Sequence, residues 1–270
     1  YKAFIFSNGV ATPIAPGSFY SIAYGINDAR QVTGLFSHIP SPSVYAFLYQ
    51  DGVFTDLGPF NSNPNGQSIG YGINQQGTIV GIVQTPSIKG MVFENGMMTT
   101  FNNSNVLRAL AINNTGSIVG TLTNNHAFLL SESKVHDLGT LDGNRDAGSV
   151  ATAVNDAGQV VGYSSFAGSP HAFLYENGAM KDLGTLRGGD SFALGINNNG
   201  DIVGVSDGSA FLYRNGVMID LQAATRDANT SFGNRFFGLT TASAINDRGQ
   251  IAGAGTFEFL GTHAVLLTPQ

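Results

Sequence analysis

The sequence contains no cysteine and no tryptophan, and only 11% of its residues are charged. Without cysteine the chain has no disulfides, thiol nucleophiles or Cys-ligated metal sites. Its 12 lysines and arginines are outnumbered by 18 acidic residues, for a net charge of -6, so we expect no nucleic-acid partner. No apolar run reaches the roughly 18 residues of a membrane-spanning helix, and we expect no membrane insertion.

Glycine and phenylalanine, in contrast, are abundant. The 270 residues include 36 glycines and 19 phenylalanines, and 42% of all residues are hydrophobic. Glycine is costly inside a helix, and charged side chains normally cover helix surfaces, so this composition favours strands joined by turns. The hydrophobic content is high enough to bury a large core, which excludes a disordered chain.

A short motif recurs along the chain. Residues 195–204 read GINNNGDIVG, and residues 153–162 read AVNDAGQVVG. The motif's asparagine recurs at intervals of 47, 39, 42, 42 and 49 residues, as Asn27, Asn74, Asn113, Asn155, Asn197 and Asn246. These intervals match the roughly 40–50-residue period of a four-stranded propeller blade. The recurrence itself favours a turn-forming role for these asparagines.

A second module, AFLYENGAMKDLG at residues 172–184, lies between successive copies of the first. Its Asn177-Gly178 pair stands between two apolar runs, which predicts a tight type I′ hairpin. The asparagine and glycine of the first motif predict a longer hairpin. Each repeat therefore supplies two hairpins, or four short strands.

Side-chain size predicts the order of strands in each blade. Residues 191–196 (SFALGI) carry many small side chains, so we place them first, nearest a crowded propeller axis. Residues 202–204 form the second strand. The Ala-Phe-Leu-Tyr strand, packed between blades, is third, and the strand exemplified by residues 180–183 lies outside it. The sequence thus predicts one all-β domain over residues 1–270, a six-bladed β-propeller of four-stranded antiparallel blades.

The two ends of the chain do not fit a simple count of six repeats. The Ala-Phe-Leu-Tyr strand has seven copies, the first at Ala3 and the last at Ala264, against six copies of the asparagine motif. We expect pairing of the N- and C-terminal strands to close the propeller and remove its sheet edges. The surplus strand is either an extra edge strand or a displaced terminal copy.

The combination of these elements resembles a known family. HAFLY at residues 171–175, DLGTL at 182–186 and IVG at 202–204 are similar to the HAF repeat family of bacterial proteins, over essentially the whole chain. The resemblance implies a propeller-like repeat fold, export, and an extracellular or cell-envelope location, with the export signal already removed from this chain. It implies no reaction.

The connections that vary in length are the expected functional site. In an up-and-down blade both tight turns lie at one end, so the variable connections share the other end, where scaffolds commonly carry recognition residues. The predicted ligand-binding residues there are Asp142, Asn144, Arg145, Asp146, Arg187, Asp190, Arg226, Asp227, Phe232, Arg235 and Phe236. Planar polar groups suit sugar hydroxyls, and an aromatic face suits a pyranose ring. The alternative is that these residues only form turns and local pairs.

The leading hypothesis is a non-enzymatic extracellular module that binds a glycan or another envelope component. One alternative is a hydrolase or lyase of an extracellular polymer, with two loop carboxylates about 5–10 Å apart. Another is a structural module that self-associates through a terminal strand, because an unpaired strand edge can recruit another chain. The sequence contains no phosphate-loop or H-E-x-x-H motif that would identify catalytic residues.

We expect no cofactor and no metal, with calcium as the remaining alternative. Asp142, Asn144 and Asp146 have the alternating oxygen spacing of a calcium loop, but the glycine and distal glutamate of an EF-hand are missing. Histidine recurs at one repeat position, as His126, His171 and His263, which would suit zinc only near the axis. The recurrent Asp56, Asp137, Asp182 and Asp220 favour bracing of a turn, because a catalytic acid is not needed once per blade.

Overall fold

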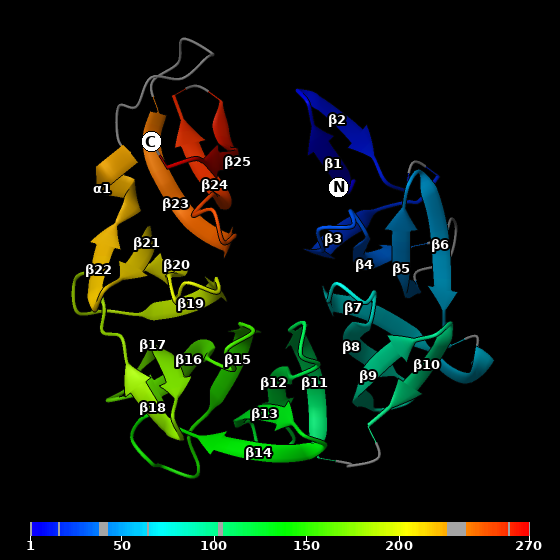
Figure 1. Ribbon diagram of the computed structural model, residues 1–270, viewed down its shortest axis with the longest axis horizontal. Coiled ribbons are helices and arrows are strands. Elements are labelled where there is room, and N and C mark those ends of the chain that lie inside the picture. Colours follow the sequence, from blue (N-terminus) through cyan, green and yellow to red (C-terminus); the bar gives the residue numbers. More distant parts are fainter. Residues whose placement is uncertain are drawn as a thin grey trace. The chain divides into compact units, whose positions relative to one another are not determined.

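The computed structural model describes residues 2–15, 17–37, 43–63, 65–101, 105–225, 236–258 and 260–269. The fold is all-β, a six-bladed β-propeller built from antiparallel sheets (Figure 1). The chain divides into two compact units, Tyr1–Asn124 with Leu130–Ser133 and Asn125–Leu129 with Lys134–Gln270. In the described part of the chain, no helix is both long and apolar enough to cross a membrane.

The first part of the chain begins with a hairpin of β1 (Phe4–Ser7) and β2 (Val10–Pro13). The next sheet contains β3 (Ser21–Ile26), β4 (Val32–Ser37), β5 (Val44–Gln50) and β6 (Val53–Gly58). After the short 3-10 helix η1 (Phe60–Ser62) come β7 (Gln67–Ile73), β8 (Ile79–Gln84), β9 (Ile88–Glu94) and β10 (Met97–Thr100). A further sheet contains β11 (Val106–Ile112), β12 (Ile118–Leu122), β13 (Ala127–Ser131) and β14 (Lys134–Gly139).

The remaining sheets follow the same plan. One contains β15 (Ser149–Val154), β16 (Val160–Phe166), β17 (Ser169–Glu176) and β18 (Ala179–Asp182). The next contains β19 (Ser191–Ile196), β20 (Ile202–Ser206), β21 (Ser209–Arg214) and β22 (Val217–Asp220). The short helix α1 (Leu221–Thr225) leads toward β23 (Phe236–Ile245), β24 (Ile251–Phe257) and β25 (Gly261–Leu267), which form a three-stranded sheet.

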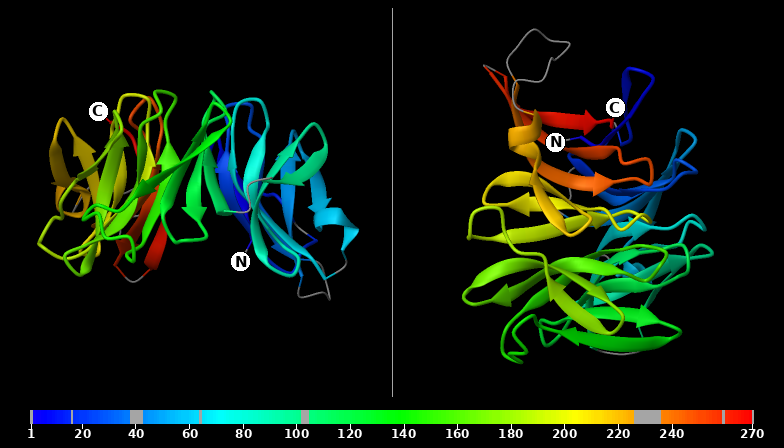
Figure 2. Two further views of the ribbon diagram at one scale, coloured as in Figure 1. Left: turned by 90° about the horizontal axis from the view of Figure 1, so that it is seen from below. Right: turned by 60° about the vertical axis from the view of Figure 1, so that its left-hand side comes forward.

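The predicted strand order is confirmed. Strands within each four-stranded sheet are hydrogen-bonded in chain order, with the small-residue strand first and the Ala-Phe-Leu-Tyr strand third. The tight hairpins also have the predicted geometry: Asn177 and Gly178 both have positive φ, +52° and +80°, as a type I′ turn requires. Strands therefore run up and down between two sets of connections (Figure 2).

Phenylalanine and glycine meet at the centre of four of the described sheets. The third-strand residues Phe47, Phe128, Phe173 and Phe211 are fully buried. Phe211 lies opposite Gly204 of the second strand, and a Cβ at Gly204 would come within 2.8 Å of the Phe211 ring and 2.0 Å of the Phe192 carbonyl oxygen. The recurrent Val-Gly of the second strand is thus required because a side chain there has no room, and burial of each Phe contributes about 1.5–3 kcal/mol.

Both ends of the chain carry partial blades. Among the described residues β1 pairs with β2 in a two-stranded sheet, and β25 pairs with β24. The first and last copies of the Ala-Phe-Leu-Tyr strand, which bring the number of copies to seven, therefore both form strands, β1 and β25. Pairing between the terminal strands, and with it the closure of the propeller, stays a prediction.

Candidate functional site

The two ends of the sheets differ in their polar chemistry. We call the end with the Asn-x-x-Gly and Asn-Gly hairpins the turn end. The opposite end, which in the second unit includes residues 140–148 and 184–190, is the loop end.

At the turn end, the motif asparagine makes bonds both within and between repeats. The Asn197 side-chain oxygen accepts hydrogen bonds from the backbone N–H of Asn199 (3.0 Å) and Asp201 (2.9 Å). Its Nδ2 donates to the backbone carbonyl of Asn246 in the next sheet at 3.1 Å. Asn155 donates in the same way to the Asn197 carbonyl, also at 3.1 Å. The recurrent asparagine therefore closes its own turn, as predicted, and in these two repeats it also joins its sheet to the next.

The first unit contains the same ladder. Asn27 Nδ2 donates to the Asn74 carbonyl at 2.8 Å, and Asn74 Nδ2 donates to the Asn113 carbonyl at 3.4 Å. The residue after the asparagine adds a second row, because Gln75 Oε1 accepts a hydrogen bond from the Asp28 backbone N–H at 3.2 Å. Polar side chains at the turn end thus serve mainly to join repeats.

A half-buried ion pair also lies at the turn end. The Arg214 guanidinium donates two hydrogen bonds to Asp201, each 2.7 Å long. The Asp201 side chain is nearly buried, whereas the Arg214 side chain is partly exposed. The Arg214 hydrogen bond lowers the pKa of the Asp201 carboxyl against the opposing effect of burial.

At the loop end, the recurrent aspartates brace turns as predicted. The Oδ1 atoms of Asp137 and Asp182 accept hydrogen bonds from the backbone N–H two residues on, at 2.9 and 2.8 Å. Each of these carboxylates also contacts a histidine: Nδ1 of His126 lies 2.9 Å from Asp137, and Nδ1 of His171 lies 3.0 Å from Asp182. A His–Asp pair therefore joins the third and fourth strands of these two sheets.

The pairs account for two of the three recurrent histidines. Nε2 of His126 lies 3.2 Å from the Arg145 carbonyl oxygen, so both ring nitrogens of His126 have polar neighbours. The third, His263, has its Nε2 3.0 Å from the Leu260 carbonyl oxygen. Across the part of the chain that the structure covers, no cluster of three His, Cys, Asp or Glu side chains is arranged to hold a metal ion.

The predicted ligand-binding residues 142–146 form one exposed loop. Oδ1 of Asp142 accepts hydrogen bonds from the Thr140 hydroxyl (3.1 Å) and the Asn144 backbone N–H (3.0 Å). Oδ1 of Asn144 accepts from the Asp146 backbone N–H at 3.1 Å. Asp142 and Asn144 therefore shape the loop. Arg145 and Asp146 are exposed, and within the described residues their side chains make no hydrogen bond or ion pair.

Arg187 has a bracing role that the sequence did not predict. Its NH2 lies 2.5 Å from Oδ2 of Asp220, its NH1 donates to the Ser209 hydroxyl at 3.0 Å, and its backbone N–H donates to Asp207 at 2.8 Å. Ser209 occupies the position that His171 has in the preceding sheet, so Arg187 replaces the histidine as the partner of the recurrent aspartate. A role of Arg187 in ligand binding stays a prediction.

Asp190 remains a candidate. It is exposed, its backbone oxygen accepts the Asp207 N–H at 3.0 Å, and its carboxylate has no partner among the residues that the structure describes.

The prediction for Phe236 requires a correction. Phe236 is only 3% exposed, and its ring packs on Phe257 with 4.9 Å between centroids. The side chain is part of a buried apolar cluster with Leu221 and Leu239, so it offers almost no surface to a ligand. Four other predicted residues, Arg226, Asp227, Phe232 and Arg235, lie outside the described residues.

The sequence analysis missed one aromatic residue at the loop end. Phe166 ends β16, is partly exposed, and lies with its ring centroid 5.1 Å from that of His171. It falls outside both repeat motifs, beside a turn in which Ala167 has a positive φ of +50°. That break in the repeat is the signal that could have identified it.

Comparisons with known proteins bear on the fold. No family model and no curated protein matches the chain. A puromycin-hydrolyzing peptidase of Mycobacterium tuberculosis has a similar structure, with a TM-score of 0.60 and 10% identity over 98% of this chain and 46% of that one. The extracellular domain of a one-component system from B. thetaiotaomicron has a TM-score of 0.50 and 12% identity over 98% of this chain and 40% of that one. The chain thus spans less than half the length of either protein, and the likeness is one of fold.

Proposed function

We propose that the protein is an extracellular binding module and that the loop end of its second unit recognises a glycan or another cell-envelope component. The observation that supports this is the contrast between engaged and free polar groups. Side chains that recur in the repeat have hydrogen-bond partners within the fold, whereas Arg145, Asp146 and Asp190 are exposed and their side chains are unpaired within the described part of the chain. The extracellular location rests on the resemblance of the repeats to the HAF family.

These groups have the chemistry that sugar recognition needs. Carboxylates accept hydrogen bonds from hydroxyls, and a guanidinium donates several from one plane. The side chains are carried by a loop that Asp142 and Asn144 hold through their own hydrogen bonds, so ligand binding would order few additional groups. Phe166 adds an aromatic ring at the same end of its sheet.

A binding screen tests the proposal. The full chain is applied to a glycan array and titrated calorimetrically against soluble bacterial polysaccharides. We expect a ligand whose affinity falls at least about tenfold, or 1.4 kcal/mol, when Arg145→Ala, Asp146→Ala and Asp190→Ala are combined. The matched control combines Lys134→Ala and Arg248→Ala, two exposed charges at the turn end, and should bind as the wild type does.

Two outcomes would overturn this assignment: no binding to any glycan or envelope polymer, or equal binding by the triple variant.

A hydrolase would also use free carboxylates at this end, and Asp146 and Asp190 are of that kind. A reducing-end assay on any polymer that binds therefore distinguishes binding from cleavage. We expect the assay to detect no new reducing ends in the polymer, since we propose binding without cleavage.

A further inference from the structure

The three recurrent histidines differ in what their Nε2 atoms contact. Nε2 of His126 lies 3.2 Å from the Arg145 carbonyl oxygen, and Nε2 of His263 lies 3.0 Å from the Leu260 carbonyl oxygen. Nε2 of His171 has no hydrogen-bond partner in the part of the chain that the structure describes, and the His171 side chain is 18% exposed. His171 is therefore the recurrent histidine with a ring nitrogen available to a ligand.

A difference in loop length accounts for the open nitrogen. The serine that follows the loop is fixed beside the histidine strand in both sheets, because Ser149 and Ser191 each accept a backbone N–H at 2.8 Å. Between the recurrent aspartate and that serine, the loop before Ser191 is three residues shorter than the loop before Ser149. It therefore lacks an equivalent of Arg145, whose carbonyl oxygen covers His126, and the ring of His171 stays open.

A partly exposed aromatic ring lies beside His171. Phe166 ends β16, His171 lies on the neighbouring strand β17, and their ring centroids are 5.1 Å apart at an interplanar angle of 45°. Two contacts between Nδ1 of His171 and the Asp182 carboxylate, 3.0 and 3.1 Å long, hold the imidazole in place. The two rings thus form a surface whose orientation is set by the fold before any ligand binds.

The loop with the candidate residues Arg145 and Asp146 adjoins this surface. Ser165, the neighbour of Phe166 in the chain, donates its backbone N–H to the Gly148 carbonyl at 2.9 Å. The end of the loop is thereby fixed to the end of β16. Phe166 and the unpaired side chains of the loop therefore lie in one part of the loop end.

Asp190 comes from the next loop, on the side of His171. It has the repeat position of Gly148, because the carbonyl oxygens of both residues accept the equivalent backbone N–H. A Cβ placed on Gly148 would lie 3.7 Å from the carbonyl oxygen of Asn125, the residue before His126. By the same repeat geometry, the Asp190 side chain starts beside the residue before His171. Its exposed carboxylate is therefore a second polar group close to the open imidazole.

Both of these groups accept hydrogen bonds. A neutral imidazole has one N–H donor and one acceptor nitrogen. Because the Asp182 carboxylate only accepts, the proton of neutral His171 lies on Nδ1, and Nε2 accepts. The Asp190 carboxylate accepts as well. A ligand that satisfies both must donate two hydrogen bonds, as neighbouring sugar hydroxyls do, whereas a ligand carboxylate donates none and is repelled by the two aspartates.

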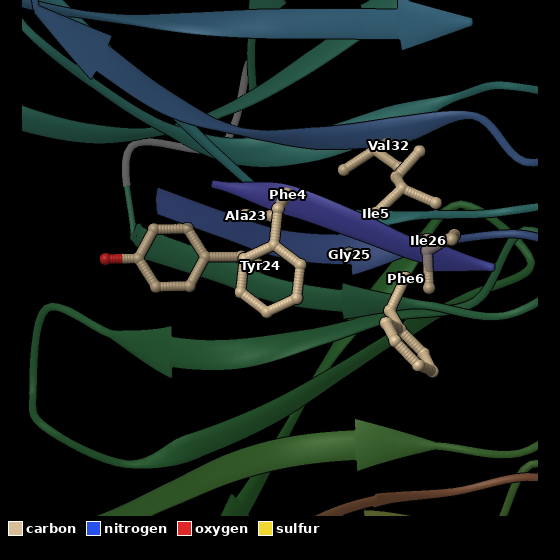
Figure 3. Close-up of a pocket in the computed structure, with 8 residues that line it drawn as sticks. All are labelled: Phe4, Ile5, Phe6, Ala23, Tyr24, Gly25, Ile26 and Val32. Carbon is tan, nitrogen blue, oxygen red and sulfur yellow. The ribbon is translucent and has the colours of Figure 1, made fainter. Parts of the chain in front are cut away.

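The first unit offers an aromatic surface without such acceptors. A cavity of about 220 Å³ between β1 and β3 is lined by eight residues, among them Phe4, Phe6 and Tyr24 (Figure 3). Tyr24 is the only one of the eight with a polar side chain, and its hydroxyl points away from Phe6. Apolar contact is available there but a pair of side-chain acceptors is not, so Phe166 and His171 are the better match for a sugar.

We propose that Phe166 and His171 form the centre of the ligand site and that the ligand is a neutral sugar. One pyranose packs its apolar face on the Phe166 ring and donates hydroxyl hydrogen bonds to His171 Nε2 and the Asp190 carboxylate. Arg145 and Asp146, on the neighbouring loop, bind the next sugar unit. This inference rests on the proposed function of the loop end and narrows its ligand to glycans without an acidic group on the bound unit.

The hydrogen-bonding role of His171 can be tested without a ligand. Two-bond ¹H–¹⁵N NMR spectra of the labelled full chain at pH 8.5 report the tautomer of each of the five histidines. The His171 signals are identified by their loss in His171→Ala. We expect the Nδ1–H tautomer. An Nε2–H tautomer would overturn the proposal, because Nε2 would then be a donor.

Calorimetric titration of the full chain tests the ligand class and the two rings. The probes are a soluble glucan, a mannan and a galactan, which are neutral, and polygalacturonate, which is acidic. We expect at least one neutral polymer to bind at least about tenfold more tightly than polygalacturonate. His171→Ala and Phe166→Leu should each weaken that binding about tenfold, whereas Phe166→Tyr should retain it because the aromatic face is kept.

Two control variants match these changes. His263→Ala removes the histidine at the same repeat position of another sheet, where a phenylalanine ring also lies beside the imidazole but Nε2 contacts the Leu260 carbonyl. Phe6→Leu removes an aromatic ring that is 65% exposed and belongs to the first unit. Both controls should bind as the wild type does, and thermal melts establish that every variant is folded at the titration temperature.

Three results of the titrations would overturn the inference: binding of polygalacturonate as tight as that of the neutral polymers, unchanged affinity in His171→Ala and Phe166→Leu, or no binding of any of the four polymers. If the combined Arg145→Ala, Asp146→Ala and Asp190→Ala variant loses affinity while those two variants keep it, the proposed function stands and this inference fails. The proposed function fails as well only if the glycan array and the envelope polymers also yield no ligand.

Discussion

The turn end and the loop end of the second unit are built on the same strands but use polar side chains differently. At the turn end Asn155 and Asn197 each bond to a backbone carbonyl of the next sheet. At the loop end Asp146 and Asp190 are exposed, with no side-chain partner in the described residues. The difference shows that polar residues which recur once per blade serve the fold, and it is the reason for our proposal that residues which interrupt the recurrence bind a ligand.

The loop end also contains structural residues. Arg187 interrupts the repeat, yet its guanidinium takes the place of a histidine and pairs with Asp220. Position on a variable loop is therefore insufficient evidence for a binding role. The Arg187 side chain already has a partner within the protein, whereas that of Arg145 has none among the described residues.

The largest effect should come from the ladder at the turn end. Asn197→Ala removes two bonds to backbone N–H groups and the bond to the Asn246 carbonyl from a buried site. We expect the free energy of unfolding to fall by about 3 kcal/mol, measured by urea denaturation. Asn198→Ala removes hydrogen bonds of the second row, which are exposed, and should cost less than about 1 kcal/mol. Equal effects of the two variants would refute the larger contribution of the buried asparagine.

A smaller effect at the turn end should depend on pH. Arg214→Ala should lower the free energy of unfolding by about 1–2 kcal/mol at pH 7, since the guanidinium is partly solvated. The folded-state pKa of Asp201 is lowered, so the pair's contribution is complete above about pH 4 and is lost as the pH falls through that lowered pKa. Urea denaturation of both proteins from pH 7 to pH 2 should show the difference shrink. A constant difference would contradict it.

At the loop end, Arg187→Ala should have a smaller effect still. The Arg187 side chain is half exposed, so we expect a loss of no more than about 1 kcal/mol in the free energy of unfolding. Asp220→Asn should have a similar effect, and the double variant should show that the two losses are not additive. Additive losses would mean that the pair contributes nothing to stability.

The sequence predicted the strands, their order and both hairpin types because these follow from local signals such as Asn177-Gly178. It also predicted the bracing role of Asp137 and Asp182 from recurrence alone. It could not predict the bonds between repeats, since the partners of Asn155 and Arg187 lie 42 and 33 residues away. Nor could it predict that Phe236 begins a strand and turns inward, because no repeat motif covers that position.

Repeated polar residues stabilise the fold, and we propose that unrepeated ones whose side chains are unpaired among the described residues bind the ligand. The most direct test measures two properties of two variants: the calorimetric affinity for the glycan ligand and the thermal midpoint of unfolding. We expect the combined Arg145→Ala, Asp146→Ala and Asp190→Ala variant to lose affinity at an unchanged midpoint, and Asn197→Ala to keep its affinity at a lowered midpoint. The reverse pattern, or loss of both properties in both proteins, would contradict it.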